Sequence, residues 1–74
     1  MLREYIYNNK FQIYLINNNI NILNYEEVSS FDENKIIIKH RDGIVVINGK
    51  NLVISKLLSD ELLVTGNITN IEFR

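Results

Sequence analysis

The stretch KIIIKHRDGIVVINGKNLVI, residues 35–54, decides the fold class. Its apolar residues are mostly β-branched and stand in two short runs, residues 36–38 and 44–47, which is typical of strands. Arg41-Asp42-Gly43 separates these runs, and glycine supplies the positive φ of a tight hairpin. Asn48-Gly49 repeats the signal before residues 52–54. The stretch therefore predicts consecutive antiparallel strands.

Strand patterns continue on both sides of this stretch. Toward the N-terminus, residues 11–16 and 20–22 alternate on either side of an asparagine turn at residues 17–19. Toward the C-terminus, residues 62–64 end at Thr65-Gly66-Asn67, and residues 68–73 form a last strand. We therefore predict that Gly43, Gly49 and Gly66 all lie in turns between strands.

Two segments break the alternating pattern. Residues 25–34 fit a short helical turn or an irregular strand with a bulge, and we favour the bulge because Ser29, Ser30 and Asp32 readily bond to nearby backbone. Residues 57–61 predict one short helical turn, too short to be stable alone.

These patterns predict an all-β fold: one small domain of about six to seven short strands, a meander folded into a sandwich or a short solenoid-like stack. Residues 1–10 are a flexible lead-in or an added edge strand that includes Tyr5 and Tyr7, and residues 11–74 form the domain. The predicted core contains Phe31, Ile47, Leu52, Leu57 and Val64, together with Phe11 and Phe73.

Residues 36–38, 44–47 and 62–64 are apolar at both odd and even positions. Such strands present apolar side chains to both faces of a sheet. A chain of 74 residues has little material to cover both faces. We therefore predict either a sheet that folds over itself or a face buried by self-association or by a protein partner.

Charge does not indicate a polyanionic partner. The chain has 8 basic and 9 acidic side chains and a formal net charge of −1. Two local clusters are ordinary solvated strand edges or a partner-binding surface: a basic one, Lys35, Lys39, Arg41, Lys50 and Lys56, and an acidic one, Glu26, Glu27, Asp32 and Glu33. A small nucleic-acid-binding barrel, with the basic cluster and stacking tyrosines such as Tyr14 and Tyr25, is the alternative function.

We predict no catalytic, cofactor-binding or metal-binding residues, and thus no enzyme. The adjacent acids Glu26-Glu27, Asp32-Glu33 and Asp60-Glu61 would point to opposite sides of a strand. His40 and Asp42 suggest a dyad with a distant serine, but no Gly-x-Ser-x-Gly turn is present, and His40 is expected to be solvated. Cysteine is absent, and Gly49-Lys50 lacks the context of a phosphate loop.

The sequence gives no membrane or export signal. No apolar run approaches the roughly 18 residues that a spanning helix needs. Residues 1–5 do not resemble the start of a signal peptide. A cytoplasmic protein is therefore expected.

The spacing of turns and apolar residues resembles the YabP/YqfC family of bacterial sporulation proteins over about residues 11–73. The residues that carry the resemblance are Val28-x-Ser30-Phe31-Asp32, Ile47-x-Gly49-x-Asn51-Leu52 and Glu61-Leu62-x-Val64-x-Gly66-x-Ile68. Ser30-Phe31-Asp32 favours the YabP branch. The resemblance implies a non-enzymatic β-rich structural or interaction module in endospore coat or cortex assembly. It also implies a location in the sporulating mother cell, at the developing spore surface, and contact with a membrane-bound sporulation protein.

Overall fold

The computed structural model describes residues 10–74, so the predicted lead-in at residues 1–10, with Tyr5 and Tyr7, lies outside the described residues except for Lys10. The described chain contains strands and no helix. The six strands are β1 (Gln12–Ile16), β2 (Asn19–Leu23), β3 (Glu27–Phe31), β4 (Lys35–His40), β5 (Gly43–Leu57) and β6 (Glu61–Phe73). The predicted all-β fold is confirmed, although β5 and β6, with 15 and 13 residues, are not short.

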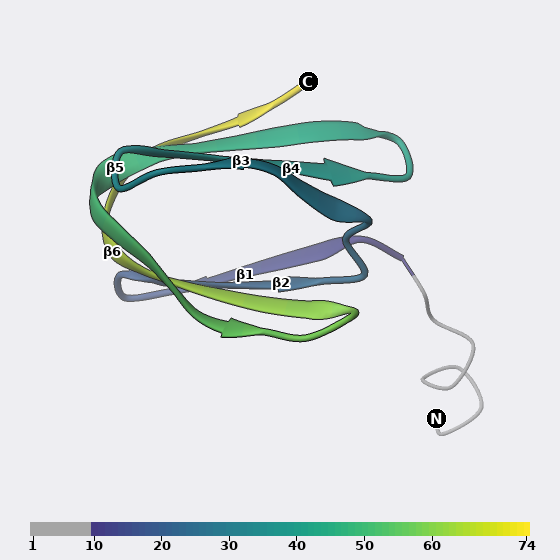
Figure 1. Cartoon of the computed structure of the whole chain (residues 1–74), viewed down its shortest axis with the longest axis horizontal. Coiled ribbons are helices and arrows are strands. Elements are labelled where there is room, and N and C mark those ends of the chain that lie inside the picture. The colour runs from purple at the N-terminus through teal and green to yellow at the C-terminus, as the bar shows by residue number, and fades with distance from the viewer. Residues whose placement is uncertain (1–9) are drawn as a thin grey trace.

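All six strands belong to one antiparallel sheet with the order β1-β2-β6-β5-β4-β3. The long strands β5 and β6 bend, so that the two ends of the sheet face each other as two layers (Figure 1). The lower layer of Figure 1 holds β1, β2 and residues 61–65 and 53–57 of β6 and β5. The upper layer holds β3, β4 and residues 43–48 and 70–73 of the same two strands. The fold is therefore a sandwich made from a single sheet.

Glycine allows β5 and β6 to bend where they cross between the layers. A Cβ on Gly49 would lie 2.3 Å from the backbone oxygen of Asn67, and one on Gly66 would lie 2.6 Å from that of Asn51. Gly66 also has a φ of +134°, which side chains rarely tolerate. Gly43, predicted to lie in a turn, is the first residue of β5, directly after the Arg41-Asp42 turn. The prediction that Gly49 and Gly66 separate strands is wrong, because each lies inside a continuous strand.

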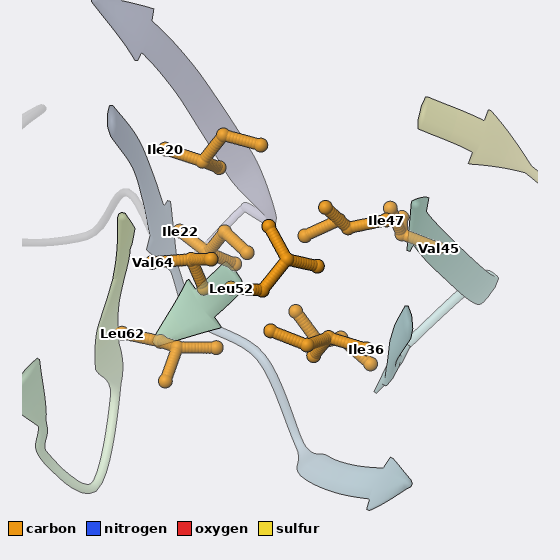
Figure 2. Close-up of a cluster of buried hydrophobic side chains, with 9 residues drawn as sticks. Ile20, Ile22, Ile36, Val45, Ile47, Leu52, Leu62 and Val64 are labelled. Atoms are coloured by element: carbon orange, nitrogen blue, oxygen red, sulfur yellow. The ribbon is translucent and has the colours of Figure 1, made fainter. Parts of the chain in front are cut away.

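The core lies between the two layers. Figure 2 shows Leu52, from the bend of β5, between Ile22 and Val64 on one side and Ile36 and Ile47 on the other. Strand alternation sends every second side chain of each layer into this space. Burying an aliphatic side chain of this size contributes about 1.5–3 kcal/mol. The buried core consists of Ile20, Ile22, Ile36, Ile38, Val45, Ile47, Leu52, Leu62 and Val64.

The predicted core is correct for Ile47, Leu52 and Val64 and wrong for Phe31, Leu57 and Phe73. Each of these three pairs with a buried core residue and so points to the core side of its layer, but each lies on a strand that has no further partner beside it at that point. The layer therefore ends there, and the side chains are exposed. Phe11 is partly buried and packs against the core.

The two segments that break the alternating pattern, residues 25–34 and 57–61, form strand and turn. β3 contains a bulge between Val28 and Ser30, which confirms the favoured interpretation of residues 25–34. The predicted helical turn at residues 57–61 is wrong, because these residues close the β5–β6 hairpin, where the Leu58 N–H donates to the Glu61 carbonyl (2.8 Å). This hydrogen bond within the hairpin takes the place of the backbone bond that a helical turn would have made.

The link between β2 and β3 fastens the layers together. The Asn24 N–H donates to the Asp60 carbonyl in the lower layer (2.7 Å), and the Glu26 N–H donates to the Lys39 carbonyl in the upper layer (2.8 Å). The Tyr25 hydroxyl, between them, donates to the Leu58 carbonyl. Burial, and then the charge of Asp60, raise the pKa of Tyr25.

Candidate protein interaction surface

Because one sheet makes both layers, residues 10–74 form four strand edges that have a neighbour on one side alone. The lower layer ends at β1 and at residues 53–57 of β5, and the upper layer ends at β3 and at residues 70–73 of β6. An open edge presents unpaired backbone groups to any other strand. Each edge is therefore a candidate interaction surface, unless its side chains or its shape prevent pairing.

Three of these edges carry features that discourage pairing. β3 is bulged, includes Glu27 and is flanked by further acids. Residues 53–57 of β5 shift register and include Lys56, which forms an ion pair with Glu61 (3.5 Å). The end of β6 includes Glu72, which Arg74 holds through two hydrogen bonds. Charges and bulges of this kind protect edges from adding strands.

The fourth edge, β1, has none of these protections. It reads Gln12-Ile13-Tyr14-Leu15-Ile16, without a charged residue, and its five residues pair with β2 without a register shift. Leu15 is 56% exposed and Ile16 is 65% exposed, and Tyr14 is exposed as well. We call Ile13, Tyr14, Leu15 and Ile16 the β1 edge surface. A regular, uncharged and apolar edge strand favours the addition of another strand.

The β1–β2 turn determines which backbone groups point away from the sheet. Asn17 and Asn18 form a two-residue loop, and Asn17 has a φ of 55°, the sign that a type II′ hairpin turn requires at that position. In such a turn Ile16 bonds to Asn19, so alternate residues of β1, including Tyr14, bond inward to β2. The N–H and C=O groups of Ile13 and Leu15 therefore point to the open edge.

The two faces of β1 also differ. Ile13 and Leu15 pair with Ile22 and Ile20, which are buried, so both point to the core side of the lower layer. Tyr14 and Ile16 point to its outer face, where the Tyr14 hydroxyl donates to Gln12. A strand added beside β1 would cover apolar side chains on both faces.

The apolar residues on the second face of the upper layer are largely covered by the chain itself. Val46 points outward but is 3% exposed. Its cross-strand neighbours are Ile37 on β4 and Glu72 on β6. The Glu72 carboxylate accepts bonds from Asn48 (3.4 Å) and Arg74 (2.7 Å) and so stays over this face. We predicted either a sheet that folds over itself or a face buried by another chain, and the structure shows the sheet folding over itself. The outer face of the upper layer therefore offers a small apolar area.

The carboxyl of Glu72 should titrate at a lower pH than an ordinary glutamate. Hydrogen bonding to Arg74, and then the charge of Arg74, lower its pKa from 4.5. A lowered folded-state pKa stabilises the fold above the unfolded pKa, and this contribution is lost as the pH falls through the folded value. We expect Arg74→Ala to raise the Glu72 pKa in an NMR titration and Arg41→Ala, in the exposed β4–β5 turn, to leave it unchanged. Equal values in all three proteins would contradict the assignment.

The structure places His40 in a packing role. Its ring stacks on Phe11, with ring centres 4.0 Å apart and planes 8° apart, and its Nδ1 accepts a bond from the Asp42 N–H (3.3 Å). The ring is half-buried and packed, so the expectation of a solvated side chain is wrong. The stack links the start of β1 in the lower layer to the end of β4 in the upper layer.

The basic cluster does not form one surface. Lys35 and Lys39 lie on the outer face of the upper layer, opposite Asn48 and Ile44. Lys56 lies on the outer face of the lower layer, in the same cross-strand row as Tyr14. Since the two outer faces point in opposite directions, these lysines are separated by the thickness of the sandwich. Within residues 10–74, no group of three or more histidine, aspartate or glutamate side chains could hold a metal ion, and no helix could span a membrane.

The exposure of β1 was not foreseen from the sequence. Alternation correctly placed Ile13 and Leu15 on one face, but it does not show that β1 ends the layer. The available signal was the absence of any charged residue from positions 11–16, a feature that β1 shares with the central strand β2, whereas β3, β4, β5 and β6 each contain at least one. An uncharged strand is typical of a central position, so the signal pointed away from an edge.

Comparison with known proteins gives one family. The YabP family matches residues 8–74. A search of curated proteins finds no match. The family match covers nearly the whole chain, including all six strands. The chain therefore belongs to the YabP family and is a sporulation-related protein.

Proposed function

We propose that this protein is a non-enzymatic interaction module in the assembly of the endospore envelope, the coat or cortex, and that it docks protein through the β1 edge surface. Membership of the YabP family supports the link to sporulation. The observation that carries the docking role is the regular, uncharged β1 strand with exposed Tyr14, Leu15 and Ile16. In this role the protein acts in the mother-cell cytoplasm, at the surface of the developing spore.

A structural role is supported by what the ionisable side chains do. Asp32 accepts bonds from the N–H groups of Asn34 (2.7 Å) and Lys35 (2.8 Å) and so shapes the β3–β4 turn. Glu61 and Glu72 form ion pairs with Lys56 and Arg74. Each of these groups stabilises a turn or a strand end.

Rigidity supports a docking role as well. β1 is held by five register pairs to β2, by the bond from Asn24 to the Lys10 carbonyl (2.6 Å) and by the stack of Phe11 on His40. A preformed edge costs little conformational entropy when another strand adds to it. Backbone hydrogen bonds then provide affinity, and the side chains on both faces provide selectivity.

The test is replacement of the gene in its sporulating host by two matched variants. Leu15→Lys puts a charge on the core side of the β1 edge, and Leu57→Lys makes the same change on the opposite edge of the lower layer, at a side chain that is 61% exposed rather than 56%. We expect the yield of heat- and lysozyme-resistant spores with Leu15→Lys to fall to that of a strain lacking the gene. Leu57→Lys should keep the original yield, with equal protein levels on immunoblots.

Two outcomes would contradict the proposal separately. Normal resistant spores from the strain without the gene would refute the envelope role. If the strain without the gene forms few resistant spores and the Leu15→Lys gene restores the original yield, the envelope role stands and docking through β1 is refuted.

A further inference from the structure

We propose that the β1 edge surface pairs with the β1 edge of a second copy, which forms a closed two-fold dimer with Tyr14 on the axis. This proposal rests on the docking role of β1 proposed above and names the partner. The two copies join their lower layers into one continuous antiparallel sheet. Three features support this dimer: the charge of the four edges, the register of the pairing and the side chains that the pairing brings together.

Charge selects β1 as the edge that can pair with itself. Two β3 edges would bring Glu27 and the neighbouring Glu26, Asp32 and Glu33 against their own copies. Like charges facing each other across a strand pair are destabilising. β1 contains no charge, and the net charge of the chain is −1, so two copies repel each other weakly. A different protein would also find no charge on this strand with which to set its orientation.

Backbone geometry then selects the register. Tyr14 is the middle residue of β1, so the antiparallel pairing that uses all five residues places Tyr14 opposite Tyr14. Ile13 then lies opposite Leu15 of the other copy. These are the residues whose N–H and C=O groups point to the open edge, so each such pair can exchange two hydrogen bonds. The register therefore gives partners to the backbone groups of both strands that do not bond to β2.

The same register joins apolar side chains on the core side. A two-fold axis perpendicular to the sheet keeps the core side of both copies on one side. Ile13 and Leu15 from each copy would then form one apolar cluster that continues both cores. Leu15, 56% exposed in the single chain, would be covered by Ile13 of its partner. Because the contact uses the same surface twice, the assembly closes at two chains.

The first test is the solution mass by light scattering over a wide range of protein concentration. We expect twice the mass of one chain for the unchanged protein and for Leu57→Lys. Leu15→Lys should give the mass of a single chain, with a circular dichroism spectrum that matches the unchanged protein. Ile16→Lys should also give single chains, whereas Val53→Lys, in the same cross-strand row at the opposite edge, should remain dimeric.

The second test measures the register by disulfide formation, which is clean because the chain contains no cysteine. Opposite residues of a non-hydrogen-bonded pair have Cα atoms about 4.5 Å apart, within the range that a disulfide spans. Tyr14→Cys should therefore form a covalent dimer on mild oxidation. Ile16→Cys should not, because residue 16 and its copy would be four positions apart along the strands, about 13 Å.

Several results would overturn the dimer. A single chain at every concentration would do so, as would a larger assembly that Leu15→Lys leaves intact or cross-linking of Ile16→Cys in preference to Tyr14→Cys. A monomer that dimerises only after residues 1–9 are removed would assign the edge to the chain's own N-terminal residues. If the unchanged protein is monomeric while Leu15→Lys still abolishes resistant spores, β1 docks a different protein, and the proposed function survives without the dimer.

Discussion

Gly66→Val should lower the free energy of unfolding by about 3 kcal/mol or more. The added Cβ would stand 2.6 Å from the Asn51 carbonyl oxygen and 3.0 Å from the Leu52 Cα, in backbone that has little room to move. Overpacking costs about 1–3 kcal/mol and a strained φ about 1–3 kcal/mol. A domain of this size has roughly 4–11 kcal/mol of stability in total. Urea denaturation followed by circular dichroism would measure the loss.

The control for this prediction is Asn67→Val, the same new side chain on the next, exposed residue of β6. An exposed strand position accepts valine, so the change should be within about 0.5 kcal/mol. If Gly66→Val were as stable as Asn67→Val, β5 and β6 could not approach each other at the bend as the structure has them.

Leu52→Ala should cost about 2–5 kcal/mol, the range for truncating a buried leucine. Leu52 is 3% exposed and stands between the two layers (Figure 2), so its removal leaves a cavity that both layers line. Leu57→Ala, five residues further along β5, removes the same atoms from a side chain that is 61% exposed. It should cost less than about 1 kcal/mol.

Melting temperatures of both leucine variants would distinguish two descriptions of the core. The sequence predicts Leu52 and Leu57 as equal core residues, whereas the structure makes them unequal. Similar losses of stability would mean that the end of β5 is covered in solution. Such a result would direct attention to an interface at that edge instead of β1.

Local pattern was sufficient for much of the fold. Runs of β-branched residues located the strands that contain Ile36, Ile38, Val45 and Ile47, and the polar residues around Ser29 indicated the bulge. These features depend on residues that are neighbours along the chain, so they can be predicted from the sequence alone. The absence of helix from residues 10–74 follows from the same β-branched composition.

The course of β5 and β6 could not be predicted in this way. Asn48-Gly49 has the residues of a hairpin turn, and nothing in the neighbouring sequence shows that the strand continues past it. Pairing with a residue distant in the sequence determines that the strand continues, since Gly49 lies opposite Ile68. The exposure of Phe31, Leu57 and Leu15 has the same origin, because strand order determines which strand ends a layer.

The position of β6 in the sheet has a consequence for synthesis of the chain. β6 is made after the other five strands described here, yet it is the partner of both β2 and β5. Leu23 pairs with Glu61, so the last residue of the β1–β2 hairpin is synthesised 38 residues before its partner in β6. At about 5–20 residues per second, that delay is roughly 2–8 s. During this interval the hairpin has neither the rest of its layer nor a core to pack against. We therefore expect that a chaperone, or rapid opening and closing of the hairpin, prevents its aggregation.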